Sequence, residues 1–210
     1  MKKLIQLLLA ALLIFGQGPV LAQHAALFDA VAAGNLGEVE RLIGAGAAVN
    51  ARNEDAETTL YLAVEKAHAE IARFLLRKGA DAKIATANGE TALHAAALNG
   101  DAGLLLLLLE HGAEVNRANR DGERPLFWAA AAGQGRAAKL LLDRGADIDA
   151  LDRQGNSALH GAVDGGHEAV VLLLLGRGAK RGLVNAARDS ALDIARRRGS
   201  AEIAKFLESR

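Results

Sequence analysis

The sequence predicts an all-α solenoid of stacked helix-turn-helix units joined by short β-hairpin-like loops. The first observation is a leucine that recurs every 33 residues without a slip, at Leu27, Leu60, Leu93, Leu126, Leu159 and Leu192. Two ladders of glycine keep the same period. They comprise Gly46, Gly79, Gly112, Gly145 and Gly178, and Gly34, Gly100, Gly133, Gly166 and Gly199, the second interrupted by Ala67. A fixed period of this length is the signature of repeat architectures, whose units bury their apolar faces against their neighbours.

Composition limits the kind of core and the kind of function. Apolar residues make up 51% of the chain but aromatic ones only 3%, so the core must be aliphatic. The absence of cysteine excludes a disulfide framework and thiolate metal sites. The 25 basic and 25 acidic side chains balance, which gives no indication of a nucleic-acid surface.

The first 22 residues differ from the rest and predict a secretory signal peptide. Lys2 and Lys3 precede an apolar run over residues 4–15, and Gly16 to Pro19 then break any helix before Ala22. The run would make about 18 Å of helix, too short to span a bilayer. We therefore expect cleavage after Ala22, a periplasmic location and no membrane insertion of the mature chain.

Each period contains the signals of two helices and a turn. In the segment Thr91–Ala97, a capping threonine precedes a leucine and a run of alanines, which predicts a short first helix. Gly100 ends it, and the apolar run Leu104–Leu109 predicts a second helix that lies in the core. Polar tips such as Asn119–Gly122 then predict a hairpin turn.

These motifs resemble the ankyrin repeat, whose Thr-Pro-Leu-His-x-Ala and Gly-Ala-Asp-Val-Asn signatures are nearly matched by Thr91–Ala96, Ser157–Ala162, Gly112–Asn116 and Gly145–Asp149. The resemblance covers residues 24–210 and is closest to exported bacterial ankyrin proteins. It implies an ankyrin-repeat domain over 23–210, with units at about 24–52, 53–85, 86–118, 119–151, 152–184 and 185–210. Two units depart from the pattern at the hairpin glycine, where Ala56 and Arg188 stand, and we expect distorted hairpins there.

The family binds protein partners with its hairpin tips and the ends of its first helices, and the resemblance carries this role to matching positions. The candidate partner-binding residues are Glu54, Asp55, Glu57, Glu65, Lys66, Asn88, Glu90, Leu98, Asn99, Arg120, Asp121, Glu123, Arg153, Gln154, Asn156 and Asp164.

Histidines and exposed leucines could also mark a metal site, a catalytic site or a second contact surface. His94 and His160 occupy the family position that hydrogen-bonds the turn, and the histidines follow no metal-ligand spacing. No nucleophile motif or phosphate loop is present, so we expect no catalytic residue, metal or cofactor. Leu106 and Leu172 occupy a position expected to face solvent, either as isolated surface leucines or as a second contact surface.

Phe127 and Trp128 are adjacent aromatics, which often anchor interfaces. The residues aligned with Trp128 in the neighbouring units are Ala95 and Gly161, small enough to make room for an indole. This favours a packing role for Trp128 over an interface role.

Together these features predict a non-enzymatic protein-interaction module that is a monomer and binds a protein partner of unknown identity through its concave face. Two alternatives stay open. One is a stress-protection factor that supports a periplasmic enzyme such as catalase, and the other is a secreted effector that acts in a host cell.

Overall fold

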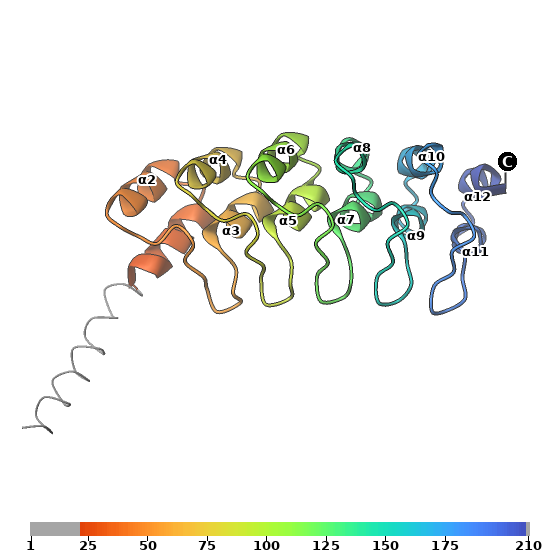
Figure 1. Cartoon of the computed structure of the whole chain (residues 1–210), viewed down its shortest axis with the longest axis horizontal. Coiled ribbons are helices and arrows are strands. Elements are labelled where there is room, and N and C mark those ends of the chain that lie inside the picture. Colours follow the sequence, from red (N-terminus) through yellow and green to blue (C-terminus); the bar gives the residue numbers. More distant parts are fainter. Residues whose placement is uncertain (1–21, 209–210) are drawn as a thin grey trace, which may run out of the picture. The chain divides into compact units, whose positions relative to one another are not determined.

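Helices follow one another in pairs through the computed structural model, which describes residues 22–208 (Figure 1). The chain divides into two compact units, Met1–Ala80 and Asp81–Arg210, and each is described by itself. The predicted signal peptide lies outside the described residues, apart from Ala22.

The first unit contains a helix over residues 22–32, followed by α2 (Leu36–Gly44), α3 (Thr59–Glu65) and α4 (Ala69–Arg77). Leu27 and Leu60 are buried in its core, as the ladder predicts. Asn35 caps α2 by accepting the Glu38 amide at 3.1 Å, and Thr58 caps α3 by accepting the Tyr61 amide at 3.1 Å. The polar residues before each helix therefore satisfy amides that the first turn leaves unpaired.

The second unit contains four helix pairs. They are α5 (Ala92–Asn99) with α6 (Ala102–Glu110), α7 (Pro125–Ala131) with α8 (Gly135–Asp143), α9 (Ala158–Asp164) with α10 (Glu168–Gly176), and α11 (Ala191–Arg197) with α12 (Ala201–Glu208). Each first helix packs on the next, since α7 contacts both α5 and α9, and α11 contacts α9. Within this unit the first helices form one row and the second helices form another (Figure 1).

The leucine ladder lies in the core of this stack. Leu93, Leu126 and Leu159 are at most 2% exposed. Leu192 is only half-buried, because α11 and α12 form the last described pair and no further helix covers that side. Alanines such as Ala96 and Ala130 are fully buried and let the helices approach closely. The predicted all-α repeat solenoid is confirmed.

No strand forms in residues 22–208, and the hairpins carry only isolated antiparallel bridges, Arg52 with Thr58, Ala85 with Thr91 and Val184 with Ser190. The leucine run of residues 104–109 lies in α6, where Leu104, Leu105 and Leu108 are buried. None of the helices in the described part of the chain has the length and apolar character needed to cross a membrane.

The expectation of distorted hairpins at Ala56 and Arg188 is wrong. Both residues adopt the left-handed backbone of the glycines they replace, with φ of 59° and 63°, against 82° at Gly122. The turn bonds are also kept, because the amide of Ala56 donates to Asn53 at 3.0 Å and that of Arg188 donates to Asn185 at 2.8 Å. The hairpin keeps its shape, and Ala56 and Arg188 bear the steric cost of a left-handed backbone with a Cβ.

Leu106 and Leu172 share the position on the second helices that was expected to face solvent, but they differ in exposure. Leu172 is 48% exposed, whereas Leu106 is half-buried, which corrects the expectation for that residue.

Candidate functional site

Every described hairpin is organised by its first residue, a short polar side chain that recurs every 33 residues. The side-chain oxygen of this residue accepts a hydrogen bond from the backbone amide two residues ahead, four residues ahead or both. Asn119 Oδ1, for example, accepts from the Asp121 amide at 3.0 Å and from the Glu123 amide at 2.9 Å. The equivalents are Asn53, Thr86, Asp152 and Asn185. These side-chain turns fix the loop without help from a sheet.

In the second unit the hairpins are also joined to one another through their backbones. The Arg120 amide donates to the Asn88 carbonyl at 2.8 Å, and the Arg153 amide donates to the Asp121 carbonyl at 2.8 Å. The Ala186 amide continues the series to the Gln154 carbonyl at 2.7 Å. The tips therefore form a bonded row, and the side chains on them have fixed spacing.

We call the tips of this row together with the carboxyl ends of α5, α7, α9 and α11 the hairpin surface. Most of the candidate residues of the second unit are exposed on it. They are Asn88, Leu98, Asn99, Arg120, Asp121, Arg153, Gln154 and Asp164.

Three candidates of the second unit are half-buried, and two of these have side chains that hold the hairpins in place. Glu123 Oε2 accepts Asn119 Nδ2 at 3.0 Å and Trp128 Nε1 at 2.8 Å. Asn156 donates to Asp152 at 3.1 Å and accepts from Asn185 at 3.0 Å. The third, Glu90, donates its backbone amide to Thr86 at 3.3 Å. Sequence position alone could not separate these inward side chains from exposed ones one or two residues away.

The candidates of the first unit divide in the same way. Glu54 and Asp55 are exposed at the hairpin tip, whereas the Glu57 carboxylate accepts Asn53 Nδ2 at 2.7 Å. Glu65 ends α3 and lies 3.5 Å from the ammonium of Lys66, and both are exposed. Four of these five candidates are therefore exposed, and Glu57 is the one whose side chain holds its own hairpin.

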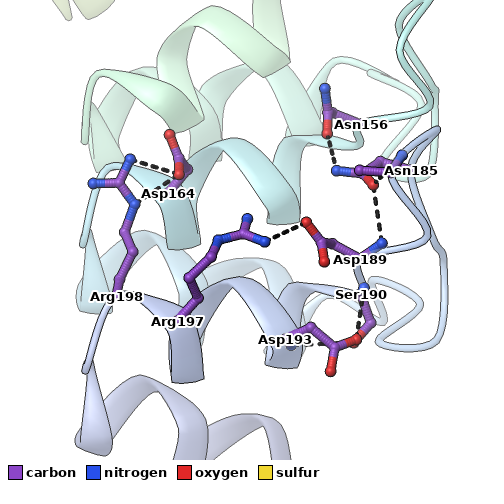
Figure 2. A network of polar contacts seen from close by, with 9 residues as sticks. Asn156, Asp164, Asn185, Asp189, Ser190, Asp193, Arg197 and Arg198 are labelled. Carbon is purple, nitrogen blue, oxygen red and sulfur yellow. Dashed lines mark hydrogen bonds and ion pairs between the residues drawn. The ribbon is translucent and has the colours of Figure 1, made fainter.

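A polar network at the last two pairs was missed by the sequence analysis. Arg198 pairs with Asp164 at 2.6 Å, and Arg197 pairs with Asp189 at 2.5 Å (Figure 2). Asp164 therefore contacts an arginine of the next pair. Opposite charges 34 residues apart were a signal that could have suggested this link.

Comparison with known families decides the classification. The family profile described as ankyrin repeats, three copies, matches residues 27–119 and 116–185. The chain belongs to the ankyrin-repeat family. A comparison with curated proteins gave no match. Ankyrin repeats are protein–protein interaction modules, and the family is in general a non-enzymatic scaffold.

The ankyrin histidines form the turn bonds expected of them. His94 Nδ1 accepts the Thr91 amide at 3.0 Å, and His160 Nδ1 accepts the Ser157 amide at 3.1 Å. His94 Nε2 lies 3.3 Å from the Glu123 carbonyl, which joins its repeat to the next hairpin. Burial lowers the pKa of His94 to about 4, so this ring is neutral at pH 7, and burial also lowers the pKa of His160.

The packing predicted around the tryptophan is partly wrong. A Cβ on Gly161 would lie 3.2 Å from the ring of Phe127, so the glycine makes room for the phenylalanine and not for Trp128. The indole lies edge-on to His94, with ring centroids 5.5 Å apart, and remains half-buried. The aromatic pair could be recognised from the sequence, but the direction of each ring could not.

The described residues contain no group of three or more His, Cys, Asp or Glu side chains that could hold a metal ion. The exposed candidates of the hairpin surface are hydrogen-bonding and charged groups, apart from Leu98, and backbone hydrogen bonds fix their spacing. Such a surface can bind another macromolecule by complementarity.

Proposed function

We propose that this protein is an exported, non-enzymatic module that binds one protein partner through its hairpin surface. The supporting observation is the bonded row of hairpins. Since the tips are fixed to one another by backbone hydrogen bonds of 2.7–2.8 Å, their exposed side chains need little ordering when a partner binds. A preorganised surface of this kind favours the binding of a partner.

Export is supported by the N-terminal sequence. A basic start, an apolar run over residues 4–15 and a small residue at Ala22 form the three-part pattern of a signal peptide. The protein then acts in the bacterial periplasm as a monomer without a cofactor. Amino-terminal sequencing of the protein from a periplasmic fraction is expected to begin at Gln23. A cytoplasmic protein that retains Met1 would refute the export proposal.

The binding proposal is tested by trapping the partner in intact cells. A photo-crosslinking amino acid replaces Gln154, which is exposed at a hairpin tip, or Arg136, which is exposed on α8 away from the hairpins. One discrete adduct is expected from position 154 and none from position 136. The trapped protein would show whether the module acts as a scaffold, supports a stress enzyme or reaches a host protein. Equal labelling from both positions would contradict the proposal.

Charge reversal gives a quantitative form of the test. Arg120→Glu with Arg153→Glu is expected to weaken binding of the trapped partner about tenfold, mainly through slower association. The matched control is Arg136→Glu with Arg144→Glu, which makes the same change in charge at two exposed arginines on α8 and at its end. Unchanged affinity in the double variant would place the binding surface elsewhere.

A further inference from the structure

An open hollow lies on the hairpin surface between α5 and α7. It is lined by Leu98, Glu123, Phe127, Trp128, Ala131 and Ala132 and has a volume of about 310 Å³. Leu98 is 46% exposed and lines the hollow together with the half-buried rings of Phe127 and Trp128, so the three side chains form one contiguous apolar patch. The hollow opens to solvent, so it is accessible to a side chain of another protein.

Hydrogen bonds and a ring contact hold the residues that line the hollow in place. The Leu98 carbonyl accepts Gln134 Nε2 at 3.0 Å, which ties the end of α5 to the start of α8. The Trp128 indole is fixed by its bond to Glu123 and by its edge contact with His94. The hollow is therefore preformed, and filling it requires no rearrangement of its walls.

The chemistry of the lining selects the occupant. The exposed lining is mostly carbon, and the indole N–H already donates to Glu123, so the hollow offers an apolar contact and no side-chain donor. Both side-chain hydrogen bonds that the Glu123 carboxylate accepts from described residues fall on Oε2, so Oε1 remains an acceptor. An apolar group with an adjacent cationic donor satisfies both parts of the site.

No cation competes for that carboxylate within the lining. Arg124, the next residue along the chain, pairs instead with Asp147 at 3.0 Å. His94, which contacts the indole, is neutral at pH 7 because burial lowers its pKa to about 4. Among residues 22–208, Glu123 is therefore the one charged side chain that lines the hollow.

We infer that this hollow is the anchor site for a partner segment that carries a large apolar side chain beside a lysine or arginine. The apolar side chain fills the space between Leu98 and Trp128, and the cation donates to Glu123 Oε1. The inference rests on the proposed function and specifies the chemistry of the partner.

The hollow is particular to this part of the repeat array. The positions that match Leu98 at the 33-residue period are Ala32, Glu65, Ala131, Asp164 and Arg197. None of these is a large apolar residue, so the other repeats do not present the same wall. A partner anchored here is held in one register along the row of hairpins.

The test uses three small probes that share a six-carbon chain and differ in the head group. Hexylamine, hexan-1-ol and hexanoate are titrated into the protein at pH 7, and the fluorescence of Trp128, the single tryptophan, is followed. Hexylamine is expected to saturate the change in the millimolar range, and hexanoate to bind at least about tenfold more weakly. Equal affinity for the three probes, or no saturable change, would overturn the inference.

Three variants locate the effect. Glu123→Gln is expected to bind hexylamine and hexan-1-ol equally, and Leu98→Ala to weaken both. Leu172→Ala, a matched truncation of an exposed leucine on α10, is expected to leave both unchanged. A Glu123→Gln protein that still prefers the amine would refute the role of the carboxylate. If a partner is trapped at position 154 but the probes show no preference, this inference fails and the proposed function stands.

Discussion

At the scale of single residues, His94 makes the stability of the fold depend on pH. The ring is fully buried, its Nδ1 accepts the Thr91 amide, and burial lowers its pKa from 6.5 to about 4. A proton on Nδ1 would remove that acceptor and place a charge in the core. The unfolded chain therefore binds a proton near pH 6.5, whereas the folded chain resists it until about pH 4.

It follows that His94 stabilises the fold fully above pH 6.5 and that this contribution is lost as the pH falls toward 4. The expected loss is about 3 kcal/mol over that range. Urea unfolding at pH 7 and pH 4.5 measures it. His94→Gln is expected to flatten the pH dependence, while His111→Gln, which changes an exposed histidine, is expected to keep it. Parallel curves for wild type and His94→Gln would contradict this account.

The residue scale also shows where sequence could not predict the candidate site. Arg120 and Glu123 lie on the same hairpin and were both predicted to bind, yet Arg120 is exposed, whereas Glu123 is half-buried, holds Asn119 and Trp128 and lines the hollow. The period fixes where a backbone position lies in the repeat. It does not fix which way a flexible side chain turns, because that depends on partners such as Trp128 that occur in one repeat only.

At the scale of elements, the hairpin dictates the conformation of the residues in it. Because side-chain turns and backbone bonds define the loop, Arg188 adopts a left-handed φ of 63° although a Cβ disfavours it. The sequence showed a missing glycine and suggested a distorted loop. The bonds of the loop outweigh the cost at one residue, which composition alone could not reveal.

Arg188→Gly is therefore expected to stabilise the protein by about 0.5–1 kcal/mol, the left-handed penalty less the added entropy of the unfolded chain. Thermal unfolding measures the change. Ala187→Gly is the matched control, because Ala187 lies beside it in the same hairpin and is not among the residues with positive φ. That control is expected to destabilise. Arg188→Gly with a lower midpoint than wild type would show that the hairpin is not strained there.

At the scale of the whole molecule, the fold was predictable because the 33-residue ladders place the same residue type at the same packing position in each repeat. Leu93, Leu126 and Leu159 are buried alike because each faces the same neighbours, and periodicity records this directly. Leu192 breaks the rule at the end of the described stack, where no further pair covers it. In a solenoid, the contribution of a residue to stability therefore depends on where its repeat lies along the stack.

The same substitution should therefore cost different amounts at different ladder positions. Leu93→Ala empties a site that is 0% exposed and is expected to destabilise by about 2–5 kcal/mol. Leu192→Ala removes a half-buried side chain at the end of the stack and is expected to cost about 1 kcal/mol. Urea unfolding followed by circular dichroism compares the two variants under identical conditions. Equal losses would mean that burial between neighbouring repeats does not determine stability, since the two leucines share a sequence position and differ in what covers them.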